Sequence, residues 1–442
     1  MRIVIVGAGA VGSFLAEKLA YEGQDVVVIE SDPERAAQAQ SEIDCLVING
    51  NGASAETLKS AGLGDSDLLF AVSSSDAVNV LACAAGTKLG IQRKVARVED
   101  PQLKAEVEAL GVDLVIDPGE AAARELLKLA SSGDIAEIIE FADGQIVLLG
   151  AYVDSNAMFV GKTLADLRES TDSHEWLVVA VIRHGETIIA RGATTLEPGD
   201  HVLMIAQKEA KEQAYDWLGL SSKPAEKAII LGGTRLAKLT ARKLADHGIH
   251  TTLIDSDMDR CRNIAEDLRH VVTVCAETKD PKILRSEGIE STDVVMALSG
   301  WDSENIVGAL VAKSLGAHEV IARLTNTDLV GLLQGVGIDA TVSSRLSAAN
   351  EILRFVRRGV IHSVATFSDS DAEAIELEVG PKSPAIGKTL VDLRLPHSLI
   401  IGGVQRNGQA FVPRGNTMIE TGDHLIVIAL PDAIPTAEKL SG

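Results

Sequence analysis

One short glycine-rich run has the residue types and the spacing of a phosphate-binding turn. It consists of Gly7, Ala8, Gly9, Ala10, Val11 and Gly12. In a GxGxxG turn between a strand and a helix, the first glycine permits a tight bend and the second lets backbone approach a pyrophosphate. The third lets the helix pack closely on the strand. The free N–H groups at the start of the helix attract an anion. The sequence therefore predicts a dinucleotide cradle at residues 7–12.

An acidic residue follows at the distance that this chemistry requires. Glu30 comes directly after the next apolar run, Val26–Ile29, where its carboxylate is placed to accept the ribose hydroxyls of an adenosine. A carboxylate at this position repels a 2′-phosphate, so the pattern favours NAD or NADH over NADP.

Further polar residues follow the later apolar runs of the same region. Gly50 and Asn51 are expected to border the adenine, Ser73 and Asp76 to lie beside the ligand, and Arg97 to neutralise a phosphate. We expect them to converge, because ligands of open parallel sheets bind at the carboxyl ends of the strands. Two alternatives remain open. Ser73 and Asp76 are also ordinary helix N-cap residues, and Arg97 could pair with the acidic residues that follow it.

The sequence of the chain contains an internal repeat, in which the same ordered set of motifs occurs twice. Ile3–Gly7 returns as Ala228–Gly232, and Gly161–Leu164 returns as Gly387–Leu390, with further matches in the same order between them. Such ordered self-similarity identifies two homologous halves. Ser221–Pro224 is the expected linker between them.

The second copy of the turn has lost two of its three glycines. It consists of Gly232, Gly233, Thr234, Arg235, Leu236 and Ala237. Thr234 places a side chain where backbone should approach a phosphate, so we expect weaker dinucleotide binding there. The acid is kept as Asp255, which makes this a weaker second candidate site. Whether it takes NAD or instead ATP or ADP remains open.

Each half begins with short apolar runs that alternate with amphipathic stretches, the pattern of a parallel sheet flanked by helices. The first half predicts strands at Ile3–Val6, Val26–Ile29, Leu46–Ile48, Leu68–Val72, Val95–Val98 and Leu114–Ile116. Each half ends in β-rich sequence with glycine turns. The predicted fold class is α/β: two tandem Rossmann-like nucleotide-binding domains, each followed by a small α+β domain. The expected boundaries are 1–133, 134–222, 225–359 and 360–442.

Composition excludes several classes of function. The 442 residues include 63 acidic and 41 basic side chains, a formal charge of −22. Such a surface repels nucleic acid and anionic lipid. No apolar run is long enough to cross a bilayer, and the histidines form no metal-binding or catalytic motif. We therefore expect a cytoplasmic protein that is not an enzyme. Its cysteines show no CxxC spacing and are predicted to be reduced and buried; they are Cys45, Cys83, Cys261 and Cys275.

The duplicated order, with the turn at residues 7–12, Glu30, Arg97 and the Gly161-Lys162 signature, resembles the regulatory subunits of Trk-type potassium-uptake systems. These TrkA-type proteins carry tandem RCK (regulator of potassium conductance, or KTN) domains. The resemblance covers essentially the whole chain. One departure is Asn51, which stands where the family usually has Asp.

The resemblance implies a nucleotide sensor that forms a homotetrameric ring. Its partner would be an integral-membrane potassium-transporting subunit, which holds it at the inner face of the cell membrane. NAD or NADH would bind in the first Rossmann-like lobe, change the shape of the ring and so gate potassium flow. The competing interpretation is an NAD-dependent oxidoreductase with duplicated Rossmann domains. The absence of a separate catalytic domain in the sequence argues against it.

Overall fold

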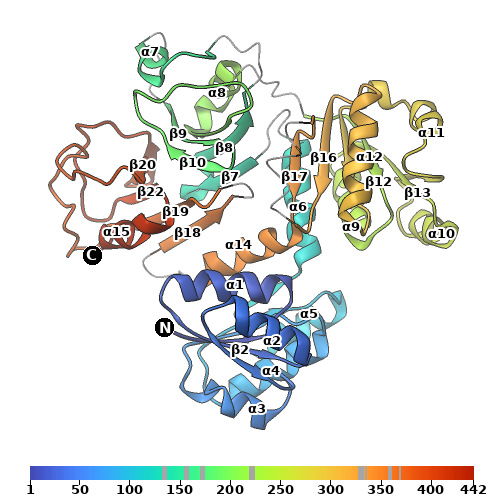
Figure 1. The fold of residues 1–442 in the computed structure, drawn as a ribbon, viewed down its shortest axis with the longest axis horizontal. Helices are drawn as coiled ribbons and strands as arrows, with labels where there is room; N and C mark the ends of the chain where they lie inside the picture. Colours follow the sequence, from blue (N-terminus) through green and yellow to red (C-terminus); the bar gives the residue numbers. More distant parts are fainter. Residues whose placement is uncertain are drawn as a thin grey trace. The chain divides into compact units, whose positions relative to one another are not determined.

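The structure, a computed structural model, describes residues 1–131, 137–153, 159–169, 175–218, 224–326, 333, 336–356, 361–367 and 370–442. The chain groups into two compact units (Figure 1). The first consists of Met1–Ala122 and Ser344–Phe355, and the second of Ala123–Ser343 and Val356–Gly442. None of the described helices combines the length and the apolar character that crossing a bilayer requires.

The first unit is built on a parallel six-stranded sheet with the strand order β3-β2-β1-β4-β5-β6. The strands are β1 (Arg2–Val6), β2 (Asp25–Glu30), β3 (Leu46–Asn49), β4 (Leu68–Ala71), β5 (Arg93–Arg97) and β6 (Leu114–Ile116). The helices of this region are α1 (Ala10–Tyr21), α2 (Pro33–Glu42), α3 (Ala55–Ser60), α4 (Asp76–Lys88), α5 (Pro101–Ala109) and α6 (Pro118–Ala130). The order of the strands reverses between β1 and β4, which is where such sheets bind ligands.

All six predicted strands of the first half are present, and no strand end differs from the prediction by more than two residues. The short helix α3 was not predicted. Ser54 caps it by accepting a hydrogen bond from the Thr57 amide, and a helix of six residues is too short to show a hydrophobic period.

A helix from the second half belongs to the first unit. Helix α14 (Ser344–Val356) contributes Ser344–Phe355 to it and lies beside α1 (Figure 1). The Arg93 guanidinium donates to the Phe355 carbonyl and lies 4.9 Å from the centre of its ring. Arg345 lies over the ring of Phe14, at 5.6 Å.

The exchange runs in the other direction as well. The part of α6 from Ala123 onward belongs to the second unit, where the Ala225 amide donates to the Ala130 carbonyl at 2.8 Å. Each half of the chain therefore supplies a helix to the unit that contains the other half's parallel sheet, an exchange that periodicity does not reveal.

The second unit contains a parallel sheet of the same order, β14-β13-β12-β15-β16-β17. Its strands are β12 (Lys227–Leu231), β13 (His250–Asp255), β14 (Val272–Cys275), β15 (Val294–Ala297), β16 (Glu319–Arg323) and β17 (Ala340–Val342). Its helices are α9 (Arg235–Asp246), α10 (Met258–Asp267), α11 (Pro281–Ser286) and α12 (Asp302–Ser314). The repeat and the α/β fold class predicted from the sequence are confirmed.

Two small antiparallel sheets complete the second unit, with orders β10-β9-β11-β8-β7 and β18-β19-β22-β20-β21. The first has β7 (Glu137–Phe141), β8 (Ile146–Tyr152), β9 (Trp176–Arg183), β10 (Glu186–Ile189) and β11 (His201–Gln207), with α7 (Leu164–Glu169) and α8 (Lys211–Leu218). The second has β18 (Ile361–Thr366), β19 (Glu373–Glu378), β20 (Leu399–Arg406), β21 (Gln409–Phe411) and β22 (His424–Ala429), with α15 (Ile434–Lys439).

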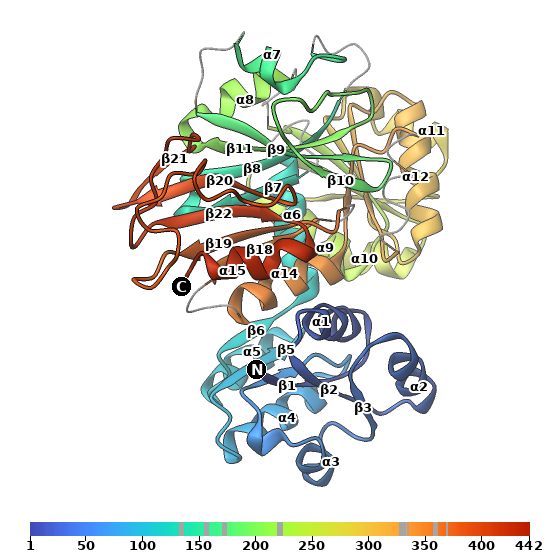
Figure 2. The same ribbon diagram turned by 60° about the vertical axis from the view of Figure 1, so that its left-hand side comes forward.

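The two small sheets pack face to face through a shared apolar core (Figure 2). Phe141 and Ile205 of the first sheet and Ile428 of the second are among its buried residues. Gly402 on β20 makes the close approach possible, since a Cβ there would lie 2.5 Å from the Ile205 side chain. The two small domains therefore form one body.

The prediction that all four cysteines are buried was wrong for two of them. Cys83 and Cys261 are buried, but Cys45 is half-buried and Cys275 is exposed. Cys275 ends β14, which is an edge strand, so an apolar strand pattern did not ensure burial there.

Candidate nucleotide site

The glycine turn between β1 and α1 has the geometry of an open cradle. Gly7 has φ = +104°, which disfavours any side chain. A Cβ on Gly12 would lie 1.9 Å from the Gly7 carbonyl oxygen, so α1 packs directly on the turn. Gly9 differs from both, because its backbone is extended (φ −75°, ψ −175°) and a Cβ there would have no atom within 4 Å. The space in front of Gly9 is therefore open to a ligand.

The N-terminus of α1 is also free of competing groups. Gly9 is the N-cap residue and offers no side-chain cap, and the first turn carries no acidic residue. The first N–H groups of the helix therefore retain their attraction for an anion.

Glu30 fixes the turn against the end of β2. Its side chain is buried, and its two oxygens accept hydrogen bonds from the Ala8 amide at 2.7 Å and the Asp32 amide at 2.9 Å. Oε1 also accepts from the Ser31 hydroxyl at 3.2 Å, whereas Oε2, which holds the Ala8 amide, keeps a second lone pair for a further donor. Glu30 can thus brace the cradle and still accept a ribose hydroxyl.

The loop after β3 lies beside Glu30. The Gly50 amide donates to the Glu30 carbonyl at 2.8 Å, and the Asn51 side chain closes its own turn by accepting from the Ala53 amide at 2.9 Å. Asn49 was missed by the sequence analysis. Its Nδ2 donates to the Glu30 carbonyl at 2.9 Å and so ties β3 to the acid.

Buried Asn79 organises the loop after β4. It accepts from the Ser73 amide at 2.9 Å and from the Ser73 hydroxyl at 2.8 Å, and it donates to the carbonyls of Ser73 and Arg97. The N-cap of α4 is Ser75, so the N-cap alternative for Ser73 and Asp76 was wrong. Ser73 is held with its backbone against the Gly7 turn, since a Cβ on Gly7 would lie 2.7 Å from the Ser73 Cα atom.

Asp76 and Arg97 both bond to the segment that follows β5. The Asp76 carboxylate accepts from the amides of Glu99, at 3.0 Å, and Asp100, at 2.9 Å. The Arg97 guanidinium pairs with the Glu99 carboxylate, which is the ion-pair alternative. The structure therefore brings the candidate residues to one edge of the sheet, with Asp76 and Arg97 engaged by protein partners.

Replacing Asp76 by alanine should lower the free energy of unfolding by roughly 1–2 kcal/mol, because two amides lose a charged acceptor. Asp302→Ala is the matched variant in the second half, where the carboxylate accepts from the Thr325 and Asn326 amides. Chemical denaturation should give similar losses for both variants. A loss in neither would show that water replaces the carboxylate without cost.

The corresponding turn of the second half is blocked. Gly232 keeps its positive φ of +105°. Thr234 caps α9, with its hydroxyl accepting from the Ala237 amide at 3.2 Å and donating to the Leu298 carbonyl at 2.7 Å. A side chain thus occupies the helix terminus that Gly9 leaves open.

Asp255 keeps the bracing role of the acid in this second crevice. Its carboxylate accepts from the Gly233 amide at 2.6 Å, and Arg260 lies 3.4 Å from its other oxygen. Trp301, which is 72% exposed, is the N-cap residue of α12, where the first half has Ser75. The two crevices share a fold but offer different surfaces.

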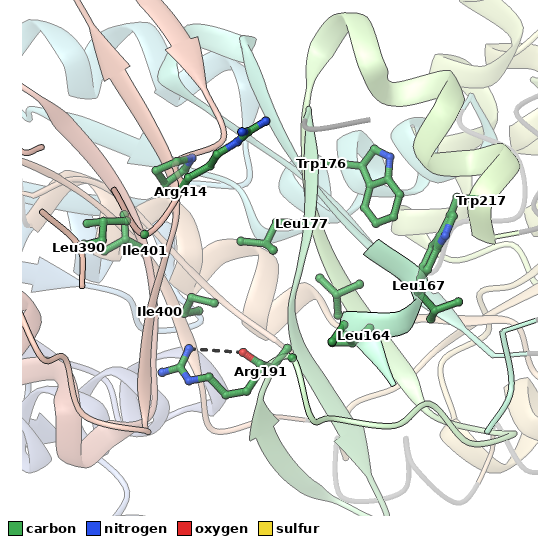
Figure 3. Close-up of a pocket in the computed structure, with 16 residues that line it drawn as sticks. Leu164, Leu167, Trp176, Leu177, Arg191, Trp217, Leu390, Ile400, Ile401 and Arg414 are labelled. Atoms are coloured by element: carbon green, nitrogen blue, oxygen red, sulfur yellow. Dashed lines mark hydrogen bonds between the residues drawn. The ribbon is translucent and has the colours of Figure 1, made fainter. Parts of the chain in front are cut away.

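A separate cavity of about 690 Å³ lies between the two small sheets (Figure 3). Trp176 and Trp217, whose rings are 4.6 Å apart, line one side, and Leu390 and Ile400 line the other. The Arg191 guanidinium donates to the Leu399 carbonyl at 2.7 Å, and burial lowers the pKa of Arg191. The sequence analysis missed this cavity, for which the repeated Arg-Gly pairs at 191–192 and 414–415 were the available signal.

The lining of this cavity is mainly apolar, with Arg191 and Arg414 as its charged members and the first residues of α7, Leu164 and Ala165, at its wall. Among the described residues, no three His, Cys, Asp or Glu side chains come together to hold a metal ion.

A Rossmann-like lobe with an open anion cradle, followed by a small antiparallel lobe and then repeated, defines the class of tandem nucleotide-binding regulators. The TrkA-N domain matches residues 3–118 and 228–344, and the TrkA-C domain matches 148–219 and 374–442. The chain belongs to the TrkA family.

Curated relatives match over their full length. The Trk system potassium uptake protein TrkA homolog of Archaeoglobus fulgidus is 32% identical, with 100% of both chains covered. The Trk system potassium uptake protein TrkA of Haemophilus influenzae is 31% identical, over 100% of this chain and 98% of its own.

Solved structures share the fold. The GsuK RCK domain aligns with a TM-score of 0.61 and 19% identity, covering 100% of this chain and 94% of that one. A GsuK channel bound to NAD gives the same TM-score and identity, with 78% of that chain covered.

Proposed function

We propose that this chain is the nucleotide-sensing regulatory subunit of a potassium-uptake system. It acts at the cytoplasmic side of a membrane, where it gates an integral-membrane potassium-transporting subunit. Relatives of equal length are named as potassium uptake proteins, which supports a regulatory subunit over the alternative of an NAD-dependent oxidoreductase.

One observation carries the ligand assignment, namely the open backbone at Gly9 beside the buried carboxylate of Glu30. The first supplies unblocked amides for a pyrophosphate and the second an acceptor for ribose hydroxyls. The ligand of the first lobe is NAD or NADH, with Gly7 to Gly12, Gly50, Asn51, Ser73, Asp76 and Arg97 around it. The second lobe, with Asp255, is a weaker site for which ATP or ADP is the alternative.

Gating follows from differential binding. A nucleotide shifts the equilibrium between two conformations only by its difference in affinity for them. In a homotetrameric ring each subunit that binds nucleotide contributes this difference in binding free energy, and the resulting change in the conformation of the ring acts on the membrane partner. In this proposal the domains are 1–133, 134–222, 225–359 and 360–442, and the two Rossmann-like domains move relative to the body that the two small domains form.

The direct test is potassium uptake by cells that lack their own regulatory subunit and express this chain with a Trk-type transporting subunit. Uptake should depend on the chain, and purified chain should bind NADH and scatter light as a tetramer. NADH binding without any effect on uptake would refute the partner. Uptake control without binding of NAD or NADH would refute the ligand.

A further inference from the structure

Two cysteines lie together at one end of the second parallel sheet. Cys261 lies in the first turns of α10 and is 5% exposed, whereas Cys275 ends β14 and is exposed. The Cys261 Sγ lies 3.2 Å from the Asp255 carbonyl oxygen and 3.8 Å from that of Val274, the residue before Cys275. The Cys275 Sγ lies 3.8 Å from the Ser256 carbonyl oxygen. Both thiols therefore contact the same two-residue segment, 255–256.

The fold does not require sulfur at this corner. In the first half β2 pairs Glu30 with Asn49, as β13 pairs Asp255 with Cys275. The position on α2 that matches Cys261 is occupied by buried Ala36. The first half thus builds the same corner from an amide and a methyl group.

The two thiols differ in the way that a reactive and a resolving cysteine differ. Burial, and then the neighbouring Cys275, raise the pKa of Cys261 to about 11. Cys275 is exposed to solvent, and dissolved oxidants react more readily with exposed thiols than with buried ones. Its partner is already adjacent, so a second bond needs no encounter between molecules.

We propose that Cys261 and Cys275 form a peroxide-reactive pair that closes to a disulfide beside Asp255. The Cys275 thiolate attacks one oxygen of a hydroperoxide; the O–O bond breaks, a sulfenic acid forms on Cys275, and the other oxygen takes a proton and leaves as water or an alcohol. The Cys261 sulfur then attacks the Cys275 Sγ. The S–O bond breaks, and hydroxide leaves with the Cys261 proton as water. Two thiols are oxidised and one peroxide is reduced.

The Cys261–Cys275 disulfide would lie beside Asp255, the residue whose carboxylate holds the turn of the second crevice. In the reduced chain the two S–H groups can donate to the carbonyls of Asp255 and Ser256, and the disulfide removes both donors. The Asp255 carboxylate holds the Gly233 amide and lies beside Arg260, the neighbour of Cys261. Oxidation of the two cysteines would therefore affect the turn at residues 232–237 of the second lobe, and not the cradle at residues 7–12 of the first.

Hydrogen peroxide treatment of the full chain, followed by tryptic peptide mapping, tests the pair. Cleavage after Arg260 and Arg262 releases Cys261 in a peptide separate from Cys275, so a disulfide joins two identifiable fragments. Free thiols should fall from the four of the sequence to two. Cys261→Ser should leave a dimedone-reactive sulfenic acid on Cys275, and Cys275→Ser should leave Cys261 unoxidised. Cys45→Ser, the control in the first half, should keep the link.

Two results would overturn the proposal. One is a wild-type chain in which Cys275 proceeds to the sulfinic acid while Cys261 stays a free thiol. The other is a link from Cys275 to Cys45, or between two copies of the chain. The mapping of the wild-type chain needs no variant, so it stands even if a substitution impairs folding.

Discussion

Gly9→Thr should reduce the affinity of the chain for NADH by at least about 100-fold, the equivalent of losing one or two charge-assisted hydrogen bonds. The second half shows what a threonine does at this position. Gly9 and Thr234 have nearly the same backbone conformation, with φ of −75° and −68°. In the first half the new hydroxyl would accept from the Gly12 amide, donate to the Val72 carbonyl and fill the space a pyrophosphate needs.

The fold should survive this substitution, since nothing lies within 4 Å of the new Cβ and threonine is a good N-cap residue. Thermal unfolding of Gly9→Thr should therefore match the wild type, and calorimetry should show the loss of NADH binding. The reciprocal variant, Thr234→Gly, opens the second turn and should raise nucleotide binding there. Undiminished NADH affinity in a well-folded Gly9→Thr chain would place the pyrophosphate elsewhere.

Glu30→Ala should weaken NADH binding by roughly 1–3 kcal/mol, about 5- to 150-fold, because it removes a charged acceptor for ribose. It also releases the Ala8 amide, which the carboxylate holds at 2.7 Å. Glu30→Gln separates the two effects: its amide oxygen can still hold Ala8, but the charge is gone. We expect an intermediate loss for this variant, measured by titration with NADH.

Asp255→Ala is the matched control for Glu30→Ala. Asp255 braces Gly233 in the same way but faces a turn already closed by Thr234, so NADH affinity should change by less than about threefold, under 1 kcal/mol. Titration with ATP should show the larger loss if the second crevice binds that nucleotide. Equal losses of NADH affinity in the two alanine variants would mean that Gly232 and Gly233 suffice to hold a pyrophosphate.

The parallel sheets could be predicted because strands buried on both faces form nearly continuous apolar runs, such as Ile3–Val6 and Ala228–Leu231. The position of the cradle followed from glycine spacing, since its geometry depends on local backbone. The same local reasoning failed where a side chain bonds across the sheet. Asp76 was considered as a helix N-cap, but its carboxylate accepts from the amides of Glu99 and Asp100, which follow β5. No sequence pattern near Asp76 predicts these two partners.

Contacts between segments that lie far apart in the chain could not be predicted from the sequence either. The cavity between the small sheets depends on how two antiparallel faces meet, with Trp176 and Ile400 far apart in the chain. Cys275 was predicted to be buried because its strand is apolar. However, β14 is an edge strand, and the Cys275 side chain at its end is exposed to solvent.

The exchange of helices between the halves has an evolutionary and a practical consequence. Two similar halves that each supply a helix to the other are what gene duplication and fusion produce from a homodimer of half-length chains with swapped helices. The N-terminal half, cut at the linker, would lose α14 and expose the surface on which it packs. We expect such a fragment to pair with a second copy, whose α6 would take the place of α14 on that surface, so that the two halves of this chain correspond to the two subunits of such a dimer.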